Sequence, residues 1–484
     1  RQPGERIMTT AVHLVSLGCS RNDVDSEELA ARLDAEGFRL VDDPDQADVI
    51  MVNTCGFIEQ AKKDSIDTIL EAADHKESGR TRAVVAVGCM AERYGTELAQ
   101  ALPEADAVLG FDSYPQIAGK LRTILAGGRI ASHEPQDRRT LLPLTPVARQ
   151  AAAHDLHTPL AVPGHSDYRP LSGPPVLRRR LHGGPFAPLK IASGCDRRCA
   201  FCAIPSFRGA YLSRPADEIV TEAQWLVGEG VKEIMLVSEN SSSYGKDLGA
   251  PRALSGLLER LAQVDGLEWI RVSYLQPAEI TPDMLEAIAS VPKVVPYFDL
   301  SFQHASAPVL RRMRRFGDPE QFVELISRVR SLAPAAGIRS NFIVGFPGEM
   351  PEDVQILADF ISEARLDVAG VFSYSPEEGT EGASLAGQID PDEIDDRHEM
   401  ISSLIDEVCN QRAAERIGEH VQVLIEDLDG DRAMAGQAAG RAAHQGPEVD
   451  GTTSVTGLDH PVVGDLVDAV VVDSEGVDLI AAVV

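Results

Sequence analysis

The sequence has few of the features that mark a membrane-embedded, secreted or disulfide-stabilised protein. It contains no run of ~18–20 consecutive apolar residues, the length that a membrane-spanning helix needs. Its first ten residues are polar and lack the apolar segment of a signal peptide. Only seven of the 484 residues are cysteine, and an odd number argues against a disulfide framework. We therefore expect a cytoplasmic protein with no membrane partner, whose cysteines bind metal or carry out thiol chemistry.

Positive charge is also scarce. The 45 Lys and Arg residues stand against 75 Asp and Glu, which gives a net charge of −30. The last 67 residues, 418–484, contain thirteen acidic residues, two arginines and no lysine, a net charge of −11. Nucleic-acid phosphate would repel such a chain unless its basic residues gathered on one surface. A basic protein fits this charge balance better as a partner.

The remaining composition is that of an ordinary globular protein of roughly two to four domains, with 44% apolar and 25% charged residues. In residues 11–130, short apolar runs alternate with amphipathic helical stretches, a pattern that predicts a doubly wound parallel α/β domain. The predicted strands are residues 11–17, 48–53 and 83–87, and the predicted helices are residues 27–36 and 58–73.

Residues 131–185 are predicted to be a linker. The stretch from 131 to 190 holds ten of the 30 prolines and five of the twelve histidines, with eight basic and four acidic residues. This composition favours a solvated segment with little secondary structure, and the irregular spacing of the histidines argues against a metal site. The basic triplet Arg178, Arg179 and Arg180 is expected to dock on an acidic face of the same chain.

Strands and helices alternate again in residues 186–417, and about six βα units predict an open, partial (β/α)6 barrel whose site lies at the carboxyl ends of the strands. Its predicted strands are residues 189–192, 233–237, 269–272, 297–300, 338–344 and 368–372. In residues 418–484 the helical period disappears, and Gly/Asp turns separate short strands, which predicts a small antiparallel β-barrel. These strands are residues 421–426, 435–439, 452–455 and 466–472.

Three cysteines, Cys195, Cys199 and Cys202, follow the first predicted strand of the partial barrel with the spacing Cys-x3-Cys-x2-Cys. Three thiolates within eight residues can hold an iron–sulfur cluster or zinc, because both prefer soft sulfur ligands. A structural zinc site usually has a fourth ligand. None lies nearby in the sequence, since Cys409 is distant and is expected to be a core thiol of a helix. Three ligands leave one iron of a cluster open.

This motif resembles that of the radical S-adenosylmethionine (AdoMet) superfamily, with Phe201 in the place of the aromatic residue before the third cysteine. The resemblance implies a 4Fe-4S cluster whose open iron is chelated by AdoMet, which is cleaved to a 5′-deoxyadenosyl radical. The candidate AdoMet contacts are Phe201 and, at the ends of two predicted strands, Asn240 and Gln303. Caps or loop hydrogen bonds explain Asn240 and Gln303 equally well. Asp299 and His304 are expected to support the site without touching AdoMet. The run Arg311, Arg312, Arg314 and Arg315 is either a binding patch or a solvated helix face.

A second set of three cysteines, Cys19, Cys55 and Cys89, belongs to the first domain, where each falls just past a predicted strand. The carboxyl ends of parallel strands share one edge of a sheet, where such folds bind ligands, so we expect the three thiols to converge there. The alternative is that they are small buried hydrophobic residues at the strand ends.

With both cysteine sets and further motifs, the sequence is similar to the methylthiotransferase family over nearly the whole chain except the linker. The resemblance implies that Cys19, Cys55 and Cys89 bind a second 4Fe-4S cluster, which delivers sulfur, and that a second AdoMet supplies the methyl group. It also implies a sulfur donor, a low-potential electron donor such as flavodoxin or ferredoxin, and a TRAM-like final barrel. It identifies no catalytic residue beyond the cluster ligands. The motifs are residues 17–22, 24–27, 53–58, 88–90, 204–209, 302–306, 311–315, 342–349, 372–375 and 377–380.

The family divides mainly into enzymes that modify an adenosine in transfer RNA and enzymes that modify an aspartate of a small-subunit ribosomal protein, protein S-twelve. A C-terminal barrel with a net charge of −11 and no lysine would repel RNA and attract a strongly basic ribosomal protein. Residues 447–451, Pro-Glu-Val-Asp-Gly, also resemble a motif of the ribosomal-protein branch. We therefore predict methylthiolation of the β-carbon of an aspartate side chain. Methylthiolation of transfer RNA and a non-catalytic acidic adaptor with vestigial clusters are the alternatives.

Overall fold

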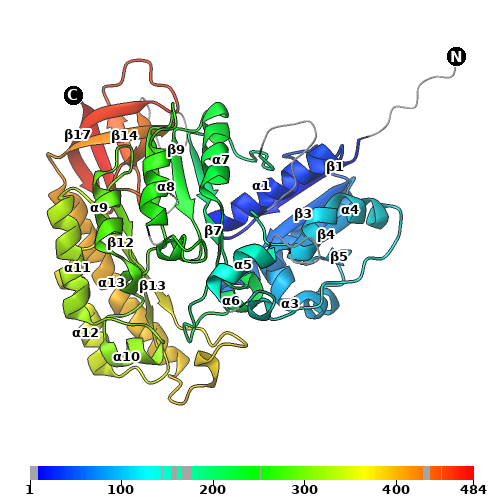
Figure 1. The fold of residues 1–484 in the computed structure, drawn as a ribbon, viewed down its shortest axis with the longest axis horizontal. Coiled ribbons are helices and arrows are strands. Elements are labelled where there is room, and N and C mark those ends of the chain that lie inside the picture. The colour runs from blue at the N-terminus through cyan, green and yellow to red at the C-terminus, as the bar shows by residue number, and fades with distance from the viewer. Residues whose placement is uncertain are drawn as a thin grey trace. The chain divides into compact units, whose positions relative to one another are not determined.

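The computed structural model describes residues 9–143, 145–153, 161–165, 176–250, 252–428, 437–447 and 450–484. The chain forms two compact units, and the colour in Figure 1 follows the residue number along the chain. The N-terminal unit consists of Arg1–Gly183, Ala192–Asp196 and Ala203–Arg214, and the barrel unit of Gly184–Ile191, Arg197–Cys202 and Pro215–Val484. Within the described residues, no helix combines the length and the apolar character needed to cross a lipid bilayer.

The N-terminal unit is built on a five-stranded sheet in the order β2-β1-β3-β4-β5, whose neighbouring strands are parallel. The three longer strands lie where the sequence predicts them, whereas the short edge strands β2 and β5 have no counterpart in the prediction. The strands are β1 (Ala11–Ser16), β2 (Arg39–Leu40), β3 (Val49–Thr54), β4 (Ala83–Val87) and β5 (Ala107–Val108).

Helices cover both faces of this sheet because its strands present apolar side chains to both sides. In β3, Val49 and Met51 belong to one buried cluster and Ile50 and Val52 to another. The first cluster contains residues of α1 and α4, and the second contains residues of α2 and α3, so the doubly wound arrangement is confirmed. The helices are α1 (Ser20–Ala35), α2 (Glu59–Ser78), α3 (Gly88–Ala101), α4 (Ile117–Leu125), α5 (Pro146–Ala153) and α6 (Ile204–Arg208). Shorter elements are η1 (Pro44–Gln46), η2 (Phe111–Gln116), η3 (Arg138–Thr140), β7 (Ala192–Ser193) and β8 (Leu212–Ser213).

The prediction of a solvated linker over residues 131–185 is wrong for part of its basic triplet. Arg178 is buried, with its Nε 2.5 Å from Glu27 Oε2 on α1, and Arg179 Nη1 lies 2.5 Å from Asp34 Oδ1. The expected docking of the triplet on an acidic face of the chain is therefore confirmed. Composition alone cannot locate such a pair, because Arg178 and Glu27 are 151 residues apart in the sequence. Residues 144, 154–160 and 166–175 of this stretch lie outside the described residues.

The barrel unit contains six parallel strands in two three-stranded sheets, ordered β10-β9-β6 and β11-β12-β13. Single parallel bridges between Ile270 and Val294 and between Leu275 and Leu300 connect the two sheets. The predicted partial barrel is confirmed. Its strands are β6 (Phe186–Lys190), β9 (Glu233–Val237), β10 (Trp269–Val272), β11 (Tyr297–Asp299), β12 (Gly337–Val344) and β13 (Val368–Ser373). Its helices are α7 (Ala216–Gly228), α8 (Ala253–Leu261), α9 (Pro282–Ser290), α10 (Ala307–Arg312), α11 (Pro319–Leu332), α12 (Pro351–Ala364) and α13 (Pro391–Glu415), with η4 (Ser241–Ser243), η5 (Pro277–Glu279) and η6 (Gly382–Ser384).

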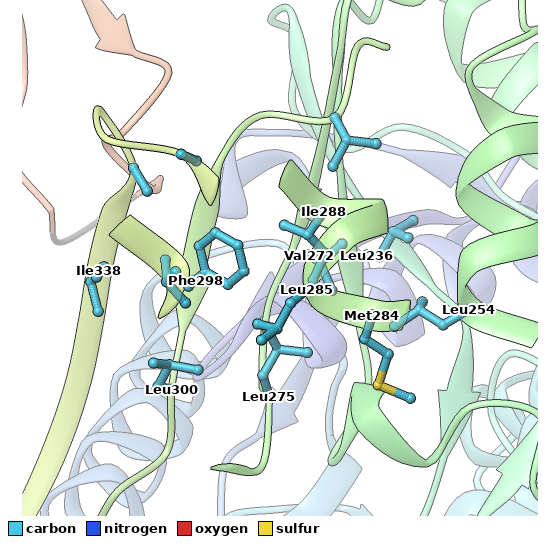
Figure 2. Packing of buried hydrophobic residues seen from close by; sticks show 14 of the residues in the cluster. Leu236, Leu254, Val272, Leu275, Met284, Leu285, Ile288, Phe298, Leu300 and Ile338 are labelled. Atoms are coloured by element: carbon cyan, nitrogen blue, oxygen red, sulfur yellow. The ribbon is translucent and has the colours of Figure 1, made fainter. Parts of the chain in front are cut away.

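Apolar side chains from strands and helices form one continuous core in the barrel unit (Figure 2). Leu236 of β9, Val272 of β10 and Phe298 of β11 belong to this cluster, together with Met284 and Leu285 of α9. Burying a side chain of this size contributes about 1.5–3 kcal/mol relative to leaving it in water. The core therefore fixes the strands whose carboxyl ends carry the expected site.

Residues from His420 onward include a closed barrel with the strand order β14-β15-β16-β18-β17. The predicted small C-terminal barrel is confirmed. One neighbouring pair, β16 with β18, is parallel, because the final strand, which the sequence analysis does not predict, lies between β16 and β17. The strands are β14 (His420–Asp427), β15 (Ala438–Ala442), β16 (Thr453–Thr456), β17 (Leu466–Glu475) and β18 (Asp478–Val483).

The C-terminal barrel packs on the amino-terminal ends of the strands of the partial barrel. Arg441 of β15 pairs at 2.5 Å with Glu233, the first residue of β9. Leu424 of β14 shares an apolar cluster with Trp269 and Tyr297, the first residues of β10 and β11. The C-terminal barrel and the site expected at the carboxyl ends therefore lie at opposite ends of these strands.

Candidate cluster and AdoMet sites

Three thiols of the N-terminal unit lie at one edge of its sheet. Cys19 is the N-cap of α1, Cys55 directly follows β3, and Cys89 lies in the first turn of α3, directly after β4. Since β1, β3 and β4 are neighbours in the sheet, their carboxyl ends bring the three side chains to the same place. The loops approach closely: a Cβ atom on Gly18, whose φ is +96°, would lie 2.8 Å from Cys55 Sγ.

The three thiols differ in their pKa. Burial would raise the pKa of Cys19, but the positive charges of Arg21 and Arg208 outweigh it and lower the pKa. Burial raises the pKa of Cys55, and it raises the pKa of Cys89 to about 12. The thiolate is the form that binds metal. Cys19 is therefore the thiol of this set that loses its proton most easily.

A buried arginine lies beside these thiols. Arg208, the last residue of α6, donates from Nη2 to Cys89 Sγ at 3.1 Å and from Nη1 to Asp25 Oδ2 at 2.7 Å. The hydroxyl of Tyr114 is buried and has no hydrogen-bond partner among the described residues. Burial raises the pKa of Tyr114 well above its usual value, so the hydroxyl keeps its proton and remains a donor. Three thiols with a cationic and a neutral donor fit an anionic iron–sulfur cluster.

Cys195, Cys199 and Cys202 lie on the loop that follows β6 and β7. Backbone hydrogen bonds shape this loop, with Cys202 N donating to Cys199 O at 3.1 Å. None of the seven cysteines forms a disulfide. Among the described residues, no three His, Cys, Asp or Glu side chains surround a single metal ion. A cluster places its own iron and sulfide atoms between the thiolates, so its ligands stand farther apart than those of one ion.

The arginine run at the end of α10 divides into exposed and buried members. Arg315 is buried, donates to Ser301 O, and has its Nη1 3.8 Å from Cys199 Sγ. The other three members, Arg311, Arg312 and Arg314, are exposed. The solvated helix face therefore describes Arg311 and Arg312, because α10 ends at Arg312. Arg314 is exposed beyond the helix, and Arg315 adds a positive charge beside the cysteine loop.

Glu279, at the end of η5, connects the cysteine loop to the end of β9. Its carboxylate pairs with Arg197, which lies inside the cysteine motif, and accepts a hydrogen bond from Asn240 Nδ2 at 3.2 Å. It also accepts from Ser243 Oγ at 2.7 Å and pairs with Lys246. Burial would raise the pKa of Glu279, but the hydrogen bonds from Lys246 and Ser243 outweigh it and lower the pKa. The carboxylate is therefore a charged anchor shared by the two loops.

The three candidate AdoMet contacts all lie in the barrel unit. Asn240 is buried, and its Oδ1 has no hydrogen-bond partner among the described residues. Gln303 has a φ of +72°, a left-handed conformation that costs a non-glycine residue about 1–2 kcal/mol and is concentrated at functional sites. Phe201 packs on a buried apolar cluster. The unpaired amide oxygen of Asn240 fits the ammonium group of AdoMet, which is a donor.

Asp299 and His304, which are expected to support the site, each contact a residue of another segment. The Nε2 of His304 is buried 3.2 Å from Glu349 Oε2, and Glu349 also pairs with Arg397 at 2.7 Å. Asp299 accepts a hydrogen bond at 2.9 Å from the backbone nitrogen of Tyr274, whose φ is +62°. The loops after β10 and β11 therefore both contain a non-glycine residue in the left-handed region.

Sequence reasoning assigns no role to Asp25, Arg208 or Glu279. Asp25 and Arg208 both lie in motifs that carry the family resemblance, at residues 24–27 and 204–209, and that is the signal that could have found them. Glu279 lies outside every motif, and its contacts are made by residues distant in the sequence.

Three family models match the chain. Residues 11–110 match a model described as uncharacterized protein family UPF0004, residues 189–361 match the radical SAM superfamily, and residues 417–484 match the TRAM domain. The first match contains Cys19, Cys55 and Cys89, and the second contains Cys195, Cys199 and Cys202.

Curated relatives match nearly the whole chain. Ribosomal protein uS12 methylthiotransferase RimO of Cutibacterium acnes is 62% identical over 99% of this chain and 98% of the relative. The proteins of the same name from Nocardioides sp. and Kineococcus radiotolerans are 61% and 59% identical, over 97% of this chain and 96% of each relative. Among solved structures, a radical S-adenosylmethionine methyltransferase, TsrM, from Kitasatospora setae gives a TM-score of 0.52 at 17% identity. It covers 75% of this chain and 73% of that one, a likeness of fold alone.

Proposed function

We propose, from the premise that the chain belongs to the RimO family of methylthiotransferases, that it attaches a methylthio group to the β-carbon of an aspartate side chain in ribosomal protein uS12. The chain is an enzyme of the radical SAM superfamily. The observation that carries the proposal is the 62% identity over 99% of the chain to a relative named for this activity. That match spans 98% of the relative as well.

Radical SAM chemistry uses AdoMet and a 4Fe-4S cluster, and we assign this cluster to Cys195, Cys199 and Cys202. When bound, the cluster and AdoMet supply a 5′-deoxyadenosyl radical that can remove hydrogen from an unactivated carbon. The chain's own contribution is orientation. Glu279 connects Arg197 of the cysteine loop to Asn240, which keeps a candidate AdoMet contact in a fixed relation to that loop. Gln303 and Phe201 are the other proposed contacts.

A second 4Fe-4S cluster is assigned to Cys19, Cys55 and Cys89. The support is their position at one sheet edge and the donors of Arg208 and Tyr114 beside them. When bound, this cluster supplies the sulfur that becomes the methylthio group, and a second AdoMet supplies the methyl. The nearby guanidinium offsets the negative charge that three thiolates bring together.

Two partners outside the chain complete the proposed reaction. Cleavage of AdoMet needs a low-potential electron donor such as flavodoxin or ferredoxin. Each methylthio group also consumes one sulfur atom, so continued turnover needs a sulfur donor.

The C-terminal barrel presents negative charge to the substrate. Arg441, the only arginine among its described residues, is buried and pairs with Glu233 and Glu426. Electrostatic complementarity would therefore steer a basic ribosomal protein toward this barrel, whereas RNA phosphate would be repelled. Its exposed acidic residues are Asp459, Asp465, Asp468, Asp473, Glu475 and Asp478.

The test is an anaerobic assay of reconstituted enzyme with AdoMet and a reductant, offered uS12 and transfer RNA in separate reactions. We expect uS12 to gain the mass of one methylthio group in place of one hydrogen, with fragmentation placing it on an aspartate, and transfer RNA to remain unchanged. Product on transfer RNA alone would overturn the substrate assignment. An iron-loaded protein that forms no 5′-deoxyadenosine would support the non-catalytic adaptor instead.

Iron analysis tests the two-cluster assignment without activity. The reconstituted protein should hold about eight irons per chain if both cysteine sets bind a 4Fe-4S cluster. Replacing Cys195, Cys199 and Cys202 together with alanine should leave about four. A wild-type protein that holds only about four irons would refute one of the two sites.

A further inference from the structure

We propose that Arg208, held by Asp25, is a positioning residue of the second cluster: its guanidinium donates a charge-assisted hydrogen bond to the Cys89 thiolate and so raises the reduction potential of the cluster. This inference rests on the proposed assignment of that cluster to Cys19, Cys55 and Cys89. It goes beyond the charge offset described above by giving Arg208 and Asp25 a defined effect on the potential of that cluster.

The geometry places one guanidinium between a carboxylate and a thiol. Arg208 Nη1 lies 2.7 Å from Asp25 Oδ2, and Nη2 lies 3.1 Å from Cys89 Sγ. Asp25 is fully buried, and Arg208 is 6% exposed. A buried charge pair carries a desolvation cost that its attraction does not reliably offset, so it is weak evidence of a role in stability. The contact with sulfur supplies another reason for placing the pair here.

The arginine is also constrained from a second direction. Its guanidinium carbon lies 4.9 Å from the centre of the Phe111 ring, a cation–π distance. Asp25 belongs to α1 and Phe111 to η2, so two separate elements of the N-terminal unit hold the side chain. This arrangement requires the planar, forked donor of arginine, because a lysine ammonium cannot extend in the same way to both the carboxylate and the sulfur.

The two residues come from different motifs that contact each other in the folded chain. Asp25 belongs to residues 24–27 and Arg208 to residues 204–209, and 183 positions separate them. Arg208 follows Cys202 by six residues. The same stretch of chain therefore carries a ligand of the first proposed cluster and a donor to the second.

A positive donor at a ligand sulfur has a defined effect on an iron–sulfur cluster. Hydrogen bonds to the sulfurs and the net charge around them set the potential of such clusters. Reduction adds an electron to a group that is already anionic, so a guanidinium next to Cys89 stabilises the reduced form more than the oxidised form. Removing the guanidinium should lower the midpoint potential.

The experiment isolates the second cluster by using the protein with Cys195→Ala, Cys199→Ala and Cys202→Ala as the parent. After anaerobic reconstitution, iron is counted and the midpoint potential is measured by a redox titration followed by EPR. We expect R208Q to retain about four irons. Its potential should fall by an amount equivalent to about a tenfold change in the reduced-to-oxidised ratio, which is 59 mV for a one-electron couple.

R138Q is the matched control. Arg138 is also buried, pairs with a carboxylate at 2.8 Å, that of Glu92, and lies 5.7 Å from the same Phe111 ring. It differs in its other acceptors: the Arg138 guanidinium donates to Asp112 and to the backbone carbonyl of Ala161, and no cysteine is among its hydrogen-bond partners in the described residues. Its replacement should leave the potential at the parent value. The proposal would be overturned if R208Q bound iron and kept the midpoint potential of the parent. It would also be overturned if R208Q and R138Q shifted the midpoint potential equally.

R208K covers the case in which R208Q does not bind iron. It keeps the charge but not the fork, so it should bind iron at a potential below that of the parent, and a parent-like potential would count against the proposal. If both Arg208 variants lose iron and their thermal unfolding is unchanged, the result supports a role of Arg208 in positioning the cluster. If both variants lose iron because they do not fold, the result contradicts that role. A parent protein that binds no iron with Arg208 intact refutes the second cluster itself, and the inference with it.

Discussion

One arginine lies beside a thiol of each cysteine set. Arg208 Nη2 is 3.1 Å from Cys89 Sγ, and Arg315 Nη1 is 3.8 Å from Cys199 Sγ. In each case a second nitrogen of the guanidinium binds another acceptor, an aspartate for Arg208 and a backbone carbonyl for Arg315. A guanidinium offsets the negative charge of an anionic group bound next to it. The side chains around both sets are therefore suited to an anionic group.

Single cysteine replacements should separate the roles of the two sets. Cys199→Ala should abolish the formation of 5′-deoxyadenosine, because the first cluster loses a ligand. Cys55→Ala should leave most AdoMet cleavage intact but stop methylthio transfer, because the sulfur source is lost. Both products are measured by mass spectrometry in one anaerobic reaction with uS12.

The matched control for these replacements is Cys409→Ala. Cys409 is buried in α13 and belongs to the apolar core of the barrel unit, and burial raises its pKa to about 12. Its replacement should affect stability but neither product. If Cys55→Ala and Cys199→Ala gave the same loss of both products, the proposed division between the two sets would be wrong.

Replacing Glu279 with glutamine should weaken AdoMet binding by about tenfold, since a hydrogen bond to a charged group contributes about 1.5–3 kcal/mol. The physical reason is that Asn240 and Arg197 both lose their shared carboxylate partner. Binding is measured by equilibrium dialysis with reconstituted enzyme. Glu286→Gln on α9, where the side chain is exposed, is the control and should bind AdoMet as the wild type does.

The same variant should change how stability depends on pH. Burial on its own raises the pKa of Glu279, but hydrogen bonds from Lys246 and Ser243 outweigh it, so the folded pKa is lower than the ordinary value of about 4.3. A lowered folded pKa contributes stability above the ordinary pKa, and this is lost as the pH falls through the folded pKa. The difference in unfolding free energy between wild type and E279Q should therefore be largest near neutral pH and shrink below about pH 4. A constant difference would contradict this reasoning.

At the scale of single elements, the loop between β1 and α1 packs closely against Cys55. Gly18 has a φ of +96°, and a Cβ atom there would lie 2.8 Å from both Cβ and Sγ of Cys55. Real Cβ atoms do not approach so closely, so any other residue would displace the thiol or its loop. The glycine therefore permits Cys19 and Cys55 to face the same edge of the sheet.

Replacing Gly18 with alanine should prevent iron from binding at the second cluster site. The substitution adds the strain of a left-handed alanine, about 1 kcal/mol, and pushes Cys55 out of place. Iron is counted in the protein whose Cys195, Cys199 and Cys202 are alanine. Gly37→Ala is the control, because Gly37 has a similar φ of +83° but no atom within 4 Å of the added Cβ. Equal iron in the two variants would show that the close approach does not matter.

Sequence patterns predict elements best where the determining residues are local. The bounds of β4 are predicted to the residue, because this strand is a short apolar run. The strand β18 is not predicted, since only a short turn separates it from β17 and it pairs in parallel with the distant β16. The cysteine sets are found from spacing and strand ends. The roles of Arg208 and Glu279 are not found from the sequence, because their partners are distant in it. Asp25 lies 183 positions from Arg208, and Asn240 lies 39 positions from Glu279.

At the scale of the barrel unit, the acidic barrel and the proposed AdoMet site occupy opposite ends of the same strands. Arg441 binds Glu233 at the start of β9, whereas Asn240 follows the end of that strand. A strand of five residues is about 16 Å long. A basic substrate attracted by the C-terminal barrel must therefore extend past the strands to reach the site. We therefore expect the C-terminal barrel to affect capture of the substrate rather than the chemical step.

Reversing charge on the acidic barrel should therefore raise the KM for uS12 and leave kcat unchanged. We choose Asp468, Asp473 and Glu475, which are exposed on β17, and replace each with lysine. Electrostatic steering changes the association rate constant by tenfold or more, so the KM should rise about tenfold at low ionic strength. The KM values of the triple variant and the wild type should converge near 1 M salt, where the Debye length is about 3 Å. The control carries lysine at Asp64, Asp67 and Glu71 on the exposed side of α2, an equal change in net charge. If both triple variants raised KM equally, total charge and not the C-terminal barrel would attract the substrate.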